Sequence, residues 1–259
     1  LGADICNSLP YRQSRKVYLA VYAAERTGNP HAFDHGTRDG HLLEQIIEKD
    51  LELRNRKVEL SEAFPAYKRQ KSYLLAGLLI DDVSNYALLS GVHAVKKDGV
   101  YHRGMEGFCA EQNMVQVPLA VLSEWERMEC DHNEIWIVEN PSIFARLCGE
   151  HPCMCMNGQP RLAGLLVLDL LAEAGTVIHY AGDLDPEGLL IAQKLSQYYK
   201  GVFYYWHMTE EDYHMCRSKE ALSERRIGML QKITDPRLLP VARAIAEYGM
   251  AGYQEKIDY

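Results

Sequence analysis

The feature that most constrains the fold is a regular alternation of apolar runs and helix-like segments between Glu134 and Trp206. The apolar runs predict four strands, at residues 134–138, 152–156, 176–181 and 201–206. The segments between them carry helical spacing and predict helices at residues 141–149, 160–174 and 186–199. Successive βαβ units of this length indicate a parallel sheet with flanking helices, which is an α/β layer structure.

Acidic residues stand where two of these predicted strands end. Glu139 follows the first strand directly, and Asp183 and Asp185 follow the third. In parallel α/β sheets, ligands bind beyond the carboxyl ends of the strands. Carboxylate oxygens suit Mg²⁺, which could support phosphodiester chemistry. The alternative is that Asp183 and Asp185 only cap the helix that begins near Pro186, although one Asp is enough for a cap.

Two neighbouring acids have simpler explanations. Glu139, which precedes Asn140-Pro141, would by itself more often be a structural cap than a catalytic group. Glu187 falls in the first turn of the predicted helix, where a negative charge is favourable, so we expect an exposed surface residue.

The first half of the chain has a different pattern. Its spacing predicts helices at residues 11–27, from Thr37 or Asp39 through Leu51, and at 67–79. Short strands are expected near Tyr86 and Val115, followed by a short helix at residues 119–127. The polar stretch 129–133 is the expected boundary, which gives a mainly helical domain 1–128 and an α/β domain 129–259. In the tail, helices are expected at 220–232 and 240–249, and Glu255 offers one more carboxylate.

Charge is distributed unevenly over these two parts. The chain has a net charge of −8, of which −1 falls in residues 1–128 and −7 in residues 129–259. The basic residues of the first part are clustered, and such clusters can neutralise phosphates. The candidates for DNA contact are Arg54, Arg56, Lys57, Lys68 and Arg69. The alternative for any single cluster is a solvated helix face.

Cysteine usage and hydropathy bear on the compartment. Seven irregularly spaced cysteines favour a reducing environment. There is neither a signal peptide nor an apolar run of the ~20 residues that cross a bilayer. We therefore expect a cytoplasmic protein without a membrane partner. Cys148, His151, Cys153 and Cys155 resemble zinc ligands, but they lack the usual spacing, and burial of Cys153 and Cys155 in a strand is the favoured interpretation.

The motif Val138-Glu139-Asn140-Pro141, with Asn157-Gly158-Gln-Pro and Gly182-Asp183-Leu-Asp185-Pro-Glu-Gly188, resembles a Toprim domain. The chain is more closely similar to DUF2399-containing proteins, which resemble the JetD nuclease subunit of Wadjet, an SMC-type plasmid-defence system. The likeness extends over most of the chain through the segments Pro30-His-Ala-Phe-Asp-His-Gly36, Asp81-Asp-Val-Ser84 and Tyr253-Gln-Glu255.

This resemblance implies a fold and an activity. A Toprim domain with a Rossmann-like parallel sheet would follow a winged-helix-like α+β domain similar to part of the topoisomerase VI A subunit. Glu139, Asp183 and Asp185 would bind Mg²⁺ or Mn²⁺ and cleave DNA, with Glu255 as an additional ligand. Asn140, Gly158 and Gly182 would shape the site. Family members are longer than this chain, so a further amino-terminal segment is expected.

The implied partners are double-stranded DNA, the subunits of an SMC-like ATPase complex and a second copy of the chain. Topoisomerases of this group use a tyrosine nucleophile, but none of the sixteen tyrosines stands in a motif that carries that role. The leading hypothesis is a metal-dependent DNA endonuclease. The alternatives are a non-catalytic DNA-binding or scaffold subunit and, ranked last, a D-x-D phosphatase, in which Glu139 would have no role.

Overall fold

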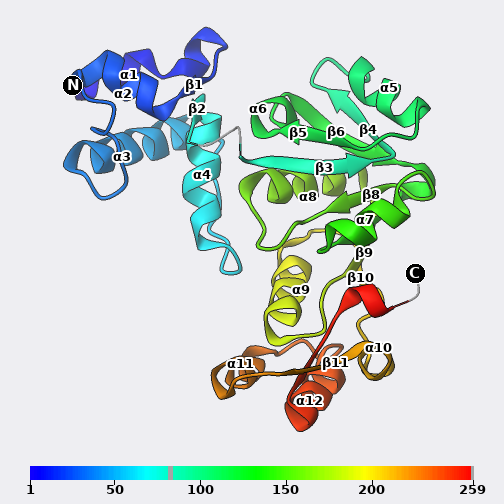
Figure 1. The fold of residues 1–259 in the computed structure, drawn as a ribbon. Coiled ribbons are helices and arrows are strands. Elements are labelled where there is room, and N and C mark those ends of the chain that lie inside the picture. Colours follow the sequence, from blue (N-terminus) through cyan, green and yellow to red (C-terminus); the bar gives the residue numbers. More distant parts are fainter. Residues whose placement is uncertain (81–83, 258–259) are drawn as a thin grey trace. The chain divides into compact units, whose positions relative to one another are not determined.

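The computed structural model describes residues 1–80 and 84–257, and these form two compact units (Figure 1). Unit 1 comprises Leu1–Asn85 together with Pro118–Ser123. Unit 2 comprises Tyr86–Val117 and the chain from Glu124 to its end. The acidic pair Asp81-Asp82, which begins the segment Asp81–Ser84 noted for its resemblance to the family, lies outside the described residues. Among the residues described, no helix combines the length and the apolar character needed to span a lipid bilayer.

Unit 1 is mainly helical, as its sequence predicts. Its elements are α1 (Gly2–Ser8), η1 (Pro10–Gln13), β1 (Val17–Tyr18), α2 (Leu19–Thr27), α3 (Arg38–Leu53), α4 (Pro65–Leu75), β2 (Leu78–Leu79) and α6 (Leu119–Leu122). Thr37 caps α3, because its hydroxyl accepts a hydrogen bond of 2.9 Å from the Gly40 amide. Tyr22, Phe33, Leu43 and Ile47 form part of its core.

The predicted helix at residues 11–27 is wrong in its first half. Ser14 adopts a left-handed conformation with φ of 52°, which ends η1 after one turn. Val17 and Tyr18 then pair in parallel with Leu78 and Leu79, and α2 begins only at Leu19. The helix predicted at residues 67–79 is also shorter than expected. α4 ends at Leu75, because Leu78 and Leu79 form β2, the partner of β1.

Unit 2 is built on a six-stranded sheet in the order β10-β9-β7-β8-β3-β5. Its strands are β3 (Tyr86–Ser90), β5 (Val115–Pro118), β7 (Glu134–Val138), β8 (Cys153–Cys155), β9 (Val177–Ala181) and β10 (Phe203–Tyr205). The neighbours from β10 to β8 are parallel, as expected, but β3 is antiparallel to β8. The sheet is therefore mixed rather than purely parallel.

Helices cover both faces of this sheet. They are α7 (Pro141–Leu147), α8 (Leu162–Ala174) and α9 (Pro186–Tyr198). Phe144 and Leu147 of α7 pack with Val138 and Ala181 on one face. On the opposite face, Gly164 of α8 lies against Met154. This alternation is the one that the sequence predicts for residues 134–206.

The boundary between the units differs from the expected position after residue 128. Residues 125–130 form β6 (Trp125–Cys130), which pairs antiparallel with β4 (Val92–Lys96), and α5 (Arg103–Ala110) lies between them in the chain. The helix predicted at 119–127 therefore ends at Leu122. Trp125 and Met128 are buried in this strand pair, and that burial favours a strand over helical continuation.

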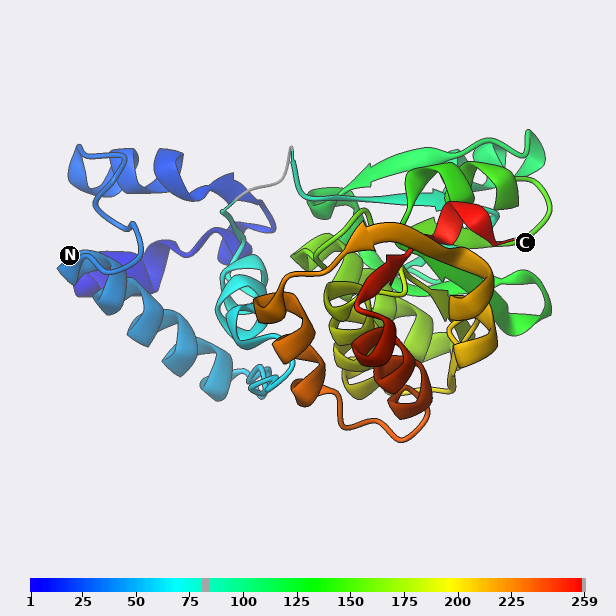
Figure 2. The ribbon, with the colours of Figure 1, turned by 60° about the horizontal axis from the view of Figure 1, so that its bottom comes forward.

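The tail adds an antiparallel strand pair that the sequence does not indicate. Its elements are α10 (Glu210–Cys216), β11 (Arg217–Ala221), α11 (Glu224–Met229), η3 (Leu230–Lys232), α12 (Leu239–Tyr248), β12 (Met250–Gly252) and η4 (Gln254–Lys256). β11 and β12 run side by side (Figure 2). Helix is thus wrong for residues 220–223, whereas the helix predicted at 240–249 matches α12 within one residue at each end. The pairing brings the end of the chain back to the sheet.

Candidate active site

The acidic residues singled out by the sequence lie together at the carboxyl edge of the unit 2 sheet. β7 and β9 are parallel neighbours in which Val138 pairs with Ala181. The next residues along each strand are Glu139 and Gly182, and the Glu139 amide donates a hydrogen bond of 3.1 Å to the Ala181 carbonyl. Asp183 and Asp185 follow on the loop that leads into α9. Strand pairing therefore brings Glu139 to the start of the loop that carries the other two acids.

Asp185 is the N-cap of α9, as the capping alternative predicts. Its Oδ1 accepts a hydrogen bond of 2.8 Å from the Gly188 amide, and Pro186 occupies the first helical position. A Cβ at position 188 would lie 2.2 Å from the Asp183 carbonyl oxygen, so only glycine allows the loop to close on the helix. The cap therefore fixes the backbone of the acidic loop.

Asp183 does not cap the helix and has a different partner. Its Oδ1 accepts a hydrogen bond of 3.0 Å from the backbone amide of Gln254, in the tail. Leu184, between the two acids, exchanges backbone hydrogen bonds of 2.9 Å with Gly252 of β12. The tail thus holds the acidic loop through an antiparallel bridge between Leu184 and Gly252.

Glu139 carries the most perturbed carboxyl group of the site. Burial, followed by the nearby charges of Asp183 and Asp185, raises its pKa to about 7, while a hydrogen bond from the Asp183 backbone amide acts in the opposite direction. Its Oε2 is buried and has no hydrogen-bond partner among the described residues. Burial first, and a neighbouring acid in addition, also raises the pKa values of Asp183 and Asp185. Negative charge is therefore concentrated at the three acids, and a cation is found only beside Asp185 among the groups that shift their pKa values.

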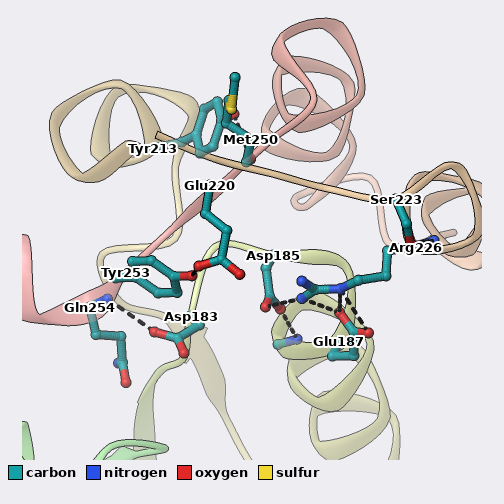
Figure 3. A network of polar contacts seen from close by, with 11 residues as sticks. Asp183, Asp185, Glu187, Tyr213, Glu220, Ser223, Arg226, Met250, Tyr253 and Gln254 are labelled. Atoms are coloured by element: carbon teal, nitrogen blue, oxygen red, sulfur yellow. Dashed lines mark hydrogen bonds and ion pairs between the residues drawn. The ribbon is translucent and has the colours of Figure 1, made fainter. Parts of the chain in front are cut away.

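One arginine enters this region from α11. Arg226 Nη2 lies 2.6 Å from Asp185 Oδ2, and the same guanidinium contacts Glu187 through Nε and Nη2 at 2.7–3.1 Å (Figure 3). Glu187 is therefore an ion-pair partner and not only the surface residue that the sequence predicts. Nothing in the spacing around Arg226 distinguishes it from its neighbour Arg225, so sequence reasoning missed it.

Two further groups from the tail lie over the acidic loop. The Tyr253 hydroxyl donates a hydrogen bond to the Glu220 carboxylate, and Figure 3 shows this pair beside Asp183 and Asp185. This hydrogen bond is the main cause that raises the pKa of Tyr253 to about 12; the charge of Asp185 adds to it. Sequence reasoning missed Glu220, because it was expected in a helix.

The expected site-shaping residues contribute in three ways. Asn140 caps α7 through its Oδ1 and donates from Nδ2 to Glu255 Oε1 at 2.6 Å, which places Glu255 near the acids. Gly182 leaves room for Glu139, because a Cβ there would lie 3.1 Å from Glu139 Oε2. Gly158 lies in the turn after β8 with φ of +84°, and a Cβ there would meet nothing within 4 Å. Its role is limited to the backbone of that turn.

The carboxylate oxygens of this region are the atoms that a divalent cation would bind. Among the described residues, no group of three or more His, Cys, Asp or Glu side chains is arranged to hold a metal ion. Both oxygens of Asp185 are already engaged, by Gly188 and by Arg226. However, Mg²⁺ is commonly held by only one or two carboxylates, together with water and phosphate. Glu139, with its unpartnered oxygen, and Asp183 meet that requirement.

The predicted DNA-contacting residues all lie in unit 1, and three of the five are paired with acids there. Arg54 lies 2.7 Å from Asp50, Lys68 lies 2.5 Å from Glu48, and Arg69 lies 2.6 Å from Glu44. Of the five, only Arg56 and Lys57 are exposed. The basic clusters are thus largely balanced by neighbouring acids.

The cysteine cluster is part of the packing between α7 and the sheet. Cys153 and Cys155 are buried and pack with Ile143, Phe144 and Leu147 of α7, as the favoured interpretation predicts. Burial raises the pKa of Cys155 to about 11 and that of Cys153 still further, so both remain thiols. The His151 ring stacks on Trp136 at 4.3 Å between centroids. These residues therefore belong to the core and to its rim.

Models of two families match successive parts of the chain. A model described as "Protein of unknown function C-terminus (DUF2399)" matches residues 115–258, and one described as "Protein of unknown function N-terminus (DUF3323)" matches residues 3–94. No curated protein matches the chain. The first match covers more than half of the sequence and contains the acidic residues of the candidate site, Glu139, Asp183, Asp185, Glu187, Glu220 and Glu255. The chain therefore belongs to the DUF2399 family.

Proposed function

We propose that this protein is a metal-dependent DNA endonuclease of the Toprim type. The observation that carries the proposal is the buried, unpartnered Oε2 of Glu139 beside two further acids at the carboxyl edge of a sheet. A divalent cation would compensate this concentration of negative charge. A phosphodiester is a fitting substrate because its oxygens can complete the shell of such a cation.

The residues of the site would divide the work as follows. Glu139 and Asp183 would hold Mg²⁺ or Mn²⁺, with Asp185 and Glu255 as further candidate ligands. When bound, the cation supplies Lewis-acid polarisation of the phosphoryl group. A carboxyl group whose pKa is about 7 is suited to accept the proton of an attacking water, which gives Glu139 a second possible role. The water oxygen would bond to phosphorus as the bond to the leaving sugar oxygen breaks.

The Toprim assignment and the partners rest on resemblance. The Gly182-Asp183-Leu-Asp185 motif and Glu139 resemble the Toprim pattern, and the resemblance of DUF2399-containing proteins to the JetD nuclease subunit supplies the connection to that protein. By that connection, the protein would act as a homodimer and as the nuclease subunit of an SMC-like anti-plasmid complex. Unit 1 would then provide the winged-helix-like DNA-binding part.

The rival functions explain fewer of the contacts. In a D-x-D phosphatase the second Asp acts on the substrate, whereas Asp185 is tied to Gly188 and to Arg226. That rival also leaves the perturbed carboxyl group of Glu139 without a purpose. A scaffold protein would not need a buried carboxylate that costs stability when it ionises. The nuclease therefore remains the function that accounts for most of these contacts.

Cleavage of closed circular plasmid DNA in Mg²⁺ or Mn²⁺ tests the proposal. We expect nicking or linearisation by the wild type, and a fall of at least about 100-fold in Asp183→Asn and in Glu139→Gln. Glu150→Gln is the matched control, because Glu150 is an exposed carboxylate of the same unit. Its rate should equal that of the wild type.

Two results would count against the nuclease. Cleavage that survives both Asp183→Asn and Glu139→Gln would indicate a contaminant or another active site. Absence of cleavage by every form, even with the partner complex added, would favour the scaffold function.

A further inference from the structure

The acidic site contains its own cation, the guanidinium of Arg226. Its Nη2 lies 2.6 Å from Asp185 Oδ2, and only a quarter of the side chain is exposed. Asp185 Oδ1 is already bound to the Gly188 amide. Arg226 therefore occupies the one oxygen of Asp185 that could otherwise face a metal ion.

Glu187 anchors this arginine independently of Asp185. The Nε of Arg226 lies 2.9–3.1 Å from both carboxylate oxygens of Glu187, and Nη2 lies 2.7 Å from Oε2. Ser223 caps the short helix α11 by accepting from the Arg226 amide, which also fixes the backbone at this residue. If the contact with Asp185 is broken, the fork on Glu187 keeps the guanidinium at the edge of the site.

A divalent cation on Asp185 Oδ2 would repel the guanidinium that already contacts that oxygen, because like charges at that distance raise the energy of the pair. We propose that Arg226 holds Asp185 in place of a divalent ion and binds a phosphate of DNA once that ion displaces it. A planar guanidinium is suited to phosphate, which it can contact through two parallel N–H donors. This inference rests on the proposed function, since it assumes that the acidic site takes a cation.

Calorimetric titration of Mn²⁺ without DNA tests the first half of the proposal. Arg226→Gln removes the competing charge, so the Kd for Mn²⁺ should fall about tenfold. Arg225→Gln is the matched control, because Arg225 is exposed on the same helix. It should leave the Kd unchanged. Equal or weaker Mn²⁺ binding by a folded Arg226→Gln protein overturns the proposal.

Plasmid cleavage at saturating Mn²⁺ tests the second half. Loss of a charged hydrogen bond to phosphate should slow Arg226→Gln by about tenfold or more, although it binds the ion more tightly. No merely structural role of Arg226 predicts opposite changes in metal affinity and in rate. Wild-type cleavage by Arg226→Gln would overturn the phosphate-binding role.

A second variant covers the case in which Arg226→Gln does not fold. Arg226→Met also removes the charge while keeping much of the length of the side chain, so it should likewise lower the Kd for Mn²⁺ about tenfold. An unchanged Kd for this folded variant contradicts the proposal.

Failure of the proposed function would look different from failure of this inference. If Asp183→Asn binds Mn²⁺ as the wild type does, the acidic site is not the metal site, and both proposals fall. If Asp183→Asn loses the ion while Arg226→Gln behaves as the wild type, only the role of Arg226 is overturned.

Discussion

Replacing Glu139 with glutamine removes the buried carboxyl group of the site while keeping its shape. In the folded protein its pKa is raised to about 7 from 4.5, first by burial and then by Asp183 and Asp185. The folded state therefore binds this proton more tightly than the unfolded chain. Protonation of Glu139 therefore stabilises the folded state fully below about pH 4.5, and this stabilisation is lost as the pH rises through about 7.

The size of the effect follows from the two pKa values. At about 1.4 kcal/mol for each pKa unit, the complete loss is about 3 kcal/mol. About 2 kcal/mol of it falls between about pH 5.5 and about pH 8. Part of the shift comes from the negative charges of Asp183 and Asp185, which become weaker when either acid is itself protonated, so these free energies are upper bounds. A glutamine side chain does not titrate, so the Glu139→Gln variant should gain this amount relative to the wild type as the pH rises.

Urea unfolding in the presence of EDTA measures the difference. All three tryptophans, Trp125, Trp136 and Trp206, belong to unit 2, so their fluorescence reports on the unit that holds the site. The control is Glu150→Gln, whose difference from the wild type should not depend on pH. A pH-independent difference between Glu139→Gln and the wild type would refute the reasoning. At the higher pH, saturating Mn²⁺ should stabilise the wild type more than the variant.

Further substitutions test other contacts. Gly188→Ala would place a Cβ 2.2 Å from a backbone oxygen, so it should destabilise unit 2 by about 2 kcal/mol or more and abolish cleavage. Gly107→Ala, where a Cβ meets nothing within 4 Å, should be neutral or stabilising in the same unfolding assay. Gln254→Ala should lower the free energy of unfolding by about 1–3 kcal/mol, because the fully buried Gln254 side chain accepts a hydrogen bond from the backbone amide of Asn140. Neutralising both Arg56 and Lys57, which are exposed, should weaken DNA binding and lower its salt slope by up to about 2. Unchanged affinity in a filter-binding assay would exclude these two residues from the interface.

The parts of the fold that the sequence predicts are those specified by local signals. Each element from β7 to β10 is an apolar run or a periodic helix bounded by a cap, a proline or a glycine. The ends of β7 and β9 meet because adjacent parallel strands must end on the same edge. Local pattern and topology together were therefore enough to bring Glu139, Asp183 and Asp185 to one edge of the sheet.

The contacts that complete the site are long-range and carry no local signal. Arg226 meets Asp185 across 41 residues of sequence, and Gln254 meets Asp183 across 71. β11 is exposed along most of its length, so its composition does not resemble a buried strand. The strands β1, β2 and β6 were missed for a related reason, since pairing with distant partners overrides local helical spacing.

The central claim is that Glu139 and Asp183 together hold a divalent cation, and anomalous X-ray scattering from Mn²⁺-soaked crystals tests it most directly. The account predicts an anomalous peak at the carboxyl edge of β7 and β9, within about 2.2 Å of oxygens from both side chains. A peak bound elsewhere, or no peak at this edge at saturating Mn²⁺, would contradict it.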